Sequence, residues 1–183
     1  MVTHAAFLRG MNVGGHRITN DDLRATFAAI GYADVGVFRA SGNVAFHAGD
    51  ASDAEATERI ERGLESELGY AVPTFVRGAQ EVLALAAEEP FPPTDIEAAK
   101  GKLQVGILRA TPAKADRDAV LALADGVDDA LTFSTTGAEL HWLPNGGTLE
   151  SELDFKAIER LVGVGTYRTK GTLEQIAKKF FAR

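Results

Sequence analysis

The sequence predicts an α+β protein of two tandem ferredoxin-like halves, each with the element order β-α-β-β-α-β and a mainly antiparallel sheet. Three observations predict this class. Short apolar runs alternate with amphipathic segments in that order, and the order starts again after a proline cluster at residues 90–93. In addition, 45% of the 183 residues are hydrophobic, which is ample for a buried core.

The first half contains the clearest local signals. Thr19 can cap a helix whose first turn is acidic, and Gly31 follows the last apolar residue of that helix. Ser41 and Gly42 suit a tight turn that joins two strands. The elements expected in this half are strands at 4–9, 34–39, 43–47 and 72–77 and helices at 19–30, 53–68 and 79–88.

The second half repeats the order of elements without detectable sequence identity to the first half. We expect strands at 102–109, 130–135, 139–143 and 166–168, and helices at 111–124, 151–162 and 172–181. The predicted organisation is therefore an N-terminal half at 1–89, a proline-rich linker at 90–101 and a C-terminal half at 102–183.

Composition excludes several classes of protein. There are no cysteines, which removes disulfides, thiolate nucleophiles and cysteine-ligated metals. The net charge of −7 comes from residues 49–100, where acidic side chains line one expected helix, and this charge opposes nonspecific nucleic-acid binding. No membrane span or signal peptide is recognisable, so a cytoplasmic location is expected. The four histidines show no metal-ligand spacing, and we expect neither a metal nor a cofactor.

The predicted topology brings two polar loops together. In each half the first and second strands of the split β-α-β unit are parallel and end at the same end of the sheet. The loop after the first strand should therefore lie beside the hairpin after the second. We call these loops the first loop cluster, and its candidate ligand-binding residues are Arg9, Gly10, Asn12, Gly14, Gly15, Arg39, Ser41, Gly42 and Asn43.

The residue types in the first loop cluster favour an anionic ligand. Glycines allow backbone N–H groups to turn toward a bound anion, and the two arginines supply positive charge. The loop matches neither the Walker A pattern nor the dinucleotide-binding pattern. A purely structural interpretation also stays open, in which the glycines serve turns and the asparagines bond to nearby backbone.

A second loop cluster combines the loop after the strand at 139–143 with the turn into the last helix. Its candidate residues are Asn145, Ser151, Arg168, Lys170 and Thr172. Two cations near a helix N-terminus suit a phosphate or a carboxylate. Helix capping alone would also explain the hydroxyl groups, because Ser151 and Thr172 both begin patterns typical of a capping box.

The opening of the sequence resembles a bacterial family known only as a domain of unknown function. The likeness rests on Phe7-Leu-Arg-Gly-Met-Asn-Val-Gly-Gly15 and on Ser41-Gly-Asn43, and it extends to residues 166–172. Members of that family commonly have Lys at the position of His16 and Gln at the position of Ala40. The resemblance implies a fold of two ferredoxin-like units, and it implies no activity, substrate or cofactor.

Three functional hypotheses follow from these patterns. The leading hypothesis is that the first loop cluster binds a small anionic ligand, such as phosphate, a nucleotide or a carboxylate. An RNA-binding module is an alternative, although the strand at 43–47 has one aromatic residue where RNA-recognition motifs need a pair. A protein-interaction module with structural loops is another. The sequence identifies no catalytic residue and leaves the oligomeric state open.

Overall fold

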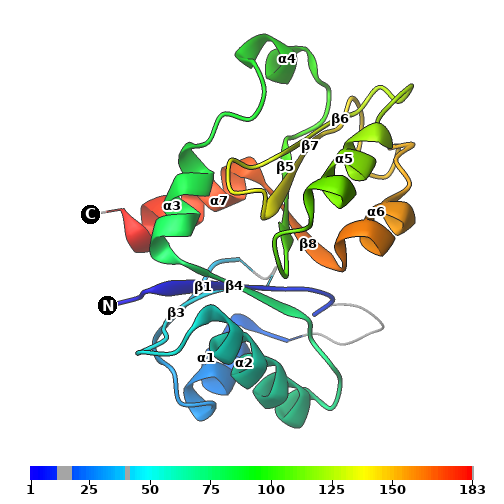
Figure 1. Cartoon of the computed structure of the whole chain (residues 1–183). Coiled ribbons are helices and arrows are strands. Elements are labelled where there is room, and N and C mark those ends of the chain that lie inside the picture. Colours follow the sequence, from blue (N-terminus) through cyan, green and yellow to red (C-terminus); the bar gives the residue numbers. More distant parts are fainter. Residues whose placement is uncertain (12–17, 40–41, 183) are drawn as a thin grey trace. The chain divides into compact units, whose positions relative to one another are not determined.

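The computed structural model describes residues 1–11, 18–39 and 42–182 and confirms the predicted α+β fold (Figure 1). By its contacts the chain forms two compact units, one of Met1–Ala84 with Glu174–Arg183 and the other of Leu85–Leu173. Each unit contains a four-stranded antiparallel sheet. Residues 174–182, which we call the C-terminal segment, thus belong to the first unit, while the predicted linker at 90–101 stays a prediction.

The first unit follows the expected order β-α-β-β-α-β. Its sheet has the strand order β2-β3-β1-β4, and β1 pairs antiparallel with both β3 and β4. The helices α1 and α2 cover one face of this sheet (Figure 1). The elements are β1 (His4–Leu8), α1 (Asn20–Ala29), β2 (Ala33–Val37), β3 (Asn43–His47), α2 (Asp53–Leu68), β4 (Thr74–Gly78) and α3 (Ala79–Ala87).

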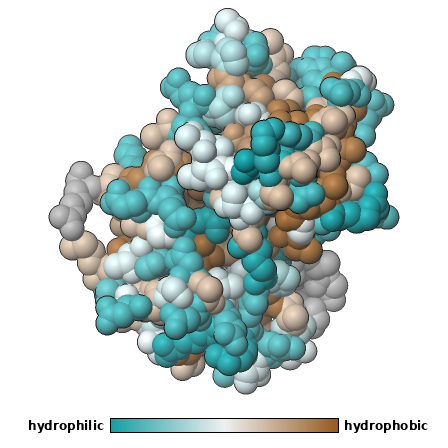
Figure 2. All heavy atoms as spheres, viewed as in Figure 1, coloured by the Kyte–Doolittle hydropathy of each residue, from teal (hydrophilic) through white to brown (hydrophobic). Residues whose placement is uncertain are grey.

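The core of the first unit lies between the sheet and its two helices. Fully buried apolar side chains from both layers meet there, with Phe27 packed edge-on against Phe46 at a centroid distance of 5.7 Å. The opposite side of α2 is rich in acidic residues, and hydrophilic residues predominate over this helix in the view of Figure 2. The buried residues of the core include Ala6, Leu8, Leu23, Val44, Ile60, Leu64 and Val76.

The second unit repeats this plan with the strand order β6-β7-β5-β8, and α5 and α6 cover one face of its sheet (Figure 1). Val120, Leu140 and Ile158 form its core. The elements are α4 (Pro93–Ala98), β5 (Gln104–Leu108), α5 (Lys114–Ala122), β6 (Ala130–Phe133), β7 (Glu139–Leu143), α6 (Phe155–Val162), β8 (Gly165–Thr169) and the start of α7 (Lys170–Ile176). The rest of α7 and the π-helical turn that follows it (Ala177–Phe181) belong to the first unit.

The C-terminal segment contacts the edge strand β2 within the first unit. A Cβ atom placed on Gly36 would lie 2.5 Å from Cε1 of Phe180, so the glycine leaves room for that ring. Ile176 and Ala177 are both buried. Among the described residues, no helix has the length and apolar character that crossing a membrane requires.

Candidate functional site

The first loop cluster begins where the sequence predicts, at the shared end of β1 and β2. Phe7 of β1 lies opposite Asn43 of β3, and the Leu8 N–H donates to the Gly42 carbonyl oxygen at 2.7 Å. The loop that follows β1 and the turn before β3 therefore start side by side. Asn12, Gly14, Gly15 and Ser41, together with His16, lie outside the described residues, and their expected roles stay predictions.

Gly42 is a glycine for two physical reasons. Its φ angle is +71°, in the left-handed region that side chains disfavour. A Cβ atom at this position would also lie 3.0 Å from the Leu8 Cβ and 3.1 Å from the Leu8 carbonyl oxygen. The close approach of the two backbones at this end of the sheet thus depends on Gly42.

Asn43 closes the turn between β2 and β3. Its side chain is buried and donates from Nδ2 to the Phe38 carbonyl oxygen at 3.2 Å, while the Phe38 N–H donates to the Asn43 carbonyl oxygen at 2.9 Å. In this structure Asn43 fixes the turn, so the structural interpretation accounts for its amide group. The expectation that Asn43 also orients a ligand stays a prediction.

Arg39 is the exposed cation of this turn. Its φ angle is +56°, which is uncommon for a residue other than glycine. The guanidinium Nη2 donates to Oε1 of Gln175 at 2.8 Å, and its Cζ lies 5.3 Å from the centroid of the Phe38 ring. Gln175 comes from the C-terminal segment, and no local sequence signal places that segment beside Arg39.

Arg9 and Met11 anchor the start of the first loop to the opposite edge of the sheet. The Arg9 N–H donates to the Pro73 carbonyl oxygen at 2.9 Å, and the Tyr70 hydroxyl donates to the Met11 carbonyl oxygen at 3.3 Å. Gly10, between them, has a φ angle of +75° and turns the chain away from β1. These bonds fix where the loop leaves the sheet and hold Arg9 at that end.

The N-terminus of α1 is occupied by a capping box. The Asp22 N–H donates to Oγ1 of Thr19 at 3.1 Å, and the Thr19 N–H donates to Oδ2 of Asp22 at 3.1 Å. Hydrogen bonds from the Thr19 side chain and backbone lower the pKa of Asp22 below its usual value. Because a carboxylate already sits at this helix end, an anion bound here would depend on the loops and arginines.

In the second loop cluster, Asn145 and Ser151 converge on a buried carboxylate. Asp129 accepts hydrogen bonds from the Asn145 N–H at 3.0 Å, from Oγ of Ser151 at 2.5 Å and from Nε1 of Trp142 at 2.8 Å. The predicted capping role of Ser151 is wrong, because α6 begins later and Asp154 caps it through the Ala157 N–H at 2.9 Å. Asp129 was not singled out from the sequence.

The cations of the second loop cluster face other partners. Arg168 donates from Nη1 to Oγ1 of Thr166 and to the Tyr167 carbonyl oxygen, both at 2.8 Å, and burial lowers its pKa to about 10. Lys170 donates from Nζ to the Ala86 carbonyl oxygen at 2.7 Å.

Thr172 takes part in capping the last helix. Its N–H donates to Oγ1 of Thr169 at 3.2 Å, and the two hydroxyl oxygens lie 2.8 Å apart. The described contacts therefore direct the residues of the second loop cluster to several separate partners. They do not gather them around one point.

A histidine–glutamate pair that sequence reasoning missed lies within the second unit. Nε2 of His141 lies 3.0 Å from Oε2 of Glu88, and Oε1 of Glu88 accepts from the N–H of Thr135 at 2.7 Å and from its hydroxyl at 2.6 Å. His141 is fully buried, and its Nδ1 has no hydrogen-bond partner among the described residues. The position of His141 in the middle of a predicted strand indicated that its side chain could be buried. No local sequence pattern indicated Glu88 as its partner.

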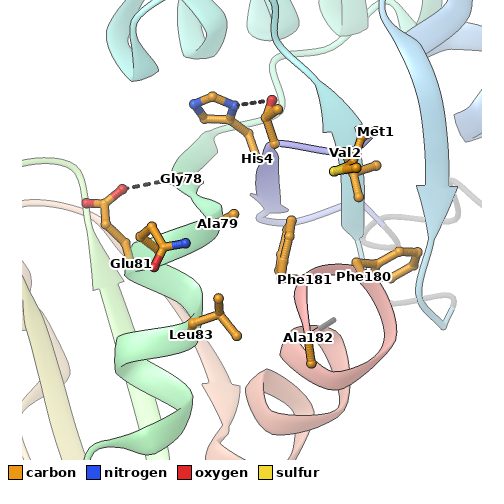
Figure 3. Close-up of a pocket in the computed structure, with 12 residues that line it drawn as sticks. Met1, Val2, His4, Gly78, Ala79, Glu81, Leu83, Phe180, Phe181 and Ala182 are labelled. Atoms are coloured by element: carbon orange, nitrogen blue, oxygen red, sulfur yellow. Dashed lines mark hydrogen bonds between the residues drawn. The ribbon is translucent and has the colours of Figure 1, made fainter.

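A pocket of about 600 Å³ opens within the first unit (Figure 3). Its lining comes from the N-terminal residues, the first turns of α3 and the C-terminal segment, with Leu83 and Phe181 among the apolar side chains. No lysine or arginine lines it. In the described part of the chain, no group of three or more histidine or acidic side chains is arranged to hold a metal ion.

Comparison with known proteins identifies the family of this chain. A model of the family described as "Protein of unknown function (DUF1697)" matches residues 1–137. The chain belongs to this family. The match confirms the predicted relation to a family of unknown function and assigns no activity. No curated protein matches the sequence.

A solved structure supports the fold along nearly the whole chain. The conserved bacterial protein SP0830 from Streptococcus pneumoniae superposes with a TM-score of 0.66 at 18% sequence identity, over 97% of each chain. At this identity the likeness concerns the fold alone. The relative is itself described only as a conserved bacterial protein, so it adds no ligand and no reaction.

Proposed function

We propose that this DUF1697 protein binds a small anionic ligand, such as phosphate, a nucleotide or a carboxylate, at the first loop cluster. The observation that carries the proposal is the 2.7 Å bond from the Leu8 N–H to the Gly42 carbonyl oxygen, since it joins the two loops at their origin. Arg9 follows Leu8 directly, and Arg39 lies three residues before Gly42. Two guanidinium groups at one end of a sheet suit the multiple acceptor oxygens of an anion.

The state of Arg39 gives further support. It is exposed and takes an uncommon backbone conformation, and its described polar partner is the neutral amide of Gln175. Of the five N–H donors of a guanidinium, this bond uses one. Unusual backbone conformations persist where the surrounding structure holds them, and they occur preferentially at functional sites. The proposal concerns binding and assigns no reaction.

The test is a thermal-shift and calorimetric screen of phosphate, nucleotides and acyl phosphates against Arg9→Ala. A charge-assisted hydrogen bond contributes about 1.5–3 kcal/mol, so the variant should bind an active compound roughly tenfold or more weakly. The matched control is Arg62→Ala, which removes an exposed arginine of α2 paired with Glu58 at 3.3 Å. If Arg9→Ala left every response of the wild-type protein unchanged, the proposal would be abandoned.

A further inference from the structure

The C-terminal segment presents one face to the turn between β2 and β3. Gln175 and Lys179 are four residues apart in the last helical stretch, so they lie on the same face of it. Gln175 accepts the hydrogen bond from Arg39, and Nζ of Lys179 lies 5.6 Å from the centroid of the Phe38 ring. A helix some 140 residues away in the sequence thus adds a second cation beside Arg39.

The ring of Phe38 contacts both cations. The Cζ of Arg39 lies 5.3 Å from the ring centroid, within the range of a cation–π contact, as does Lys179. Lys179 also lies 5.0 Å from the centroid of the Phe180 ring. The aromatic faces therefore fix the position of two long side chains that would otherwise be mobile in solvent.

Within the described part of the chain, neither Arg39 nor Lys179 pairs with a carboxylate. Elsewhere in the chain, Arg24, Arg62 and Lys114 each pair with an acidic residue on their own helix. Because the protein has 26 acidic and only 19 basic residues, two neighbouring cations without a carboxylate partner stand out from the other basic residues named here. Like charges held beside the same ring repel one another, and a bound polyanion would relieve that repulsion.

We infer that the ligand of the proposed site carries two or more negative charges on neighbouring groups, as a diphosphate does, and that Lys179 supplies a further cation beside Arg39. This inference rests on the proposed function. Arg39 binds one anionic group, with Gln175 orienting its guanidinium, and Lys179 binds the next. The C-terminal segment is then part of the binding site of the first unit, and selectivity for diphosphate over monophosphate depends on it.

The experiment measures the affinities of pyrophosphate and inorganic phosphate by calorimetry. Wild type should bind pyrophosphate more tightly than phosphate. Lys179→Ala should weaken the binding of pyrophosphate about tenfold and the binding of phosphate less than about twofold, since it removes one charged contact. Lys178→Ala is the matched control, because it removes the adjacent exposed lysine, for which no aromatic contact is described, and it should change neither affinity. Arg39→Ala should weaken both compounds.

The possible outcomes distinguish failure of this inference from failure of the proposed anion site. If Lys179→Ala and Lys178→Ala weakened pyrophosphate equally, general charge would explain the effect and the inference would be overturned. If Arg39→Ala abolished binding while Lys179→Ala preserved the preference for pyrophosphate, the anion site would stand and the inference would fail. Binding of neither compound to the wild-type protein would overturn the inference. Circular dichroism of each variant checks that it is folded.

Discussion

The carboxyl group of Glu88 leads to a prediction of how the stability of the protein depends on pH. Burial raises the pKa of this carboxyl group, but hydrogen bonds from the hydroxyl and backbone N–H of Thr135 and from His141 outweigh that effect, so its pKa lies below the usual value. The charged form is therefore favoured in the folded protein. A depressed pKa stabilises the fold at neutral pH, and this contribution is lost as the pH falls through the folded-state pKa.

Replacing Glu88 should produce a stability loss that disappears in acid. We expect Glu88→Gln to lower the free energy of unfolding at pH 7, and the difference from wild type should shrink once the pH falls below about 4.3, the ordinary glutamate value. Urea unfolding at a series of pH values measures this difference. Glu89→Gln changes the neighbouring exposed residue and should have little effect at any pH. A Glu88→Gln deficit that stayed constant down to pH 3 would contradict the prediction.

At the scale of elements, β2 is shaped for the helix that covers it. Gly36 is the fourth of the five residues of this edge strand, and the Phe180 ring occupies the space where a side chain would begin. Glycine inside a strand ordinarily weakens it, so its presence indicates a close approach rather than a conformational need. The C-terminal segment and β2 are thus fitted to one another at a single point.

Gly36→Ala should therefore destabilise the protein, although alanine usually suits a strand better than glycine. The added methyl group overlaps Phe180, and overpacking of this kind costs about 1–3 kcal/mol. Gly171→Ala is the same change in α7, where nothing lies within 4 Å, and it should be neutral or stabilise by up to about 1 kcal/mol. Chemical denaturation gives both values. The cost of Gly36→Ala should vanish in a Phe180→Ala background, and an unchanged cost there would exclude the overlap as its cause.

The elements show where sequence reasoning succeeds and where it stops. The start of α1 was predictable because Thr19 and Asp22 bond to each other across three residues. The start of α6 was not, because Ser151 bonds to Asp129, which lies 22 residues earlier. The short helix α4 has no buried residue, so the sequence contains no periodic apolar pattern that would have predicted it.

On the scale of the whole molecule, strand polarity allowed the neighbourhood of Leu8 and Gly42 to be predicted. Two parallel strands joined by a helix end together, whatever the loops contain. The contacts of Arg39 with Gln175 and of Phe38 with Lys179 could not be predicted in this way. They depend on where the last helix packs, and that is decided by the shapes of distant surfaces rather than by local pattern.

Removing the C-terminal segment should weaken the first unit selectively. A chain ending at Leu173 lacks the buried Ile176 and Ala177 as well as Phe180, and burial of one large apolar side chain contributes about 1.5–3 kcal/mol. Amide hydrogen exchange should accelerate more in β2 than in β6, which is also an edge strand but belongs to the other unit. Equal acceleration in both strands would show that the segment acts on overall stability alone.

The membership of residues 174–182 in the first unit also bears on how the protein is made. A ribosome releases residues 1–84 early, yet the residues that complete their packing are synthesised only after residues 85–173. The N-terminal unit therefore stays incompletely packed while the second unit is synthesised. Domains that fold strictly one after another during translation have no such delay. Expressing the two halves as separate polypeptides would leave the N-terminal half without its final helix.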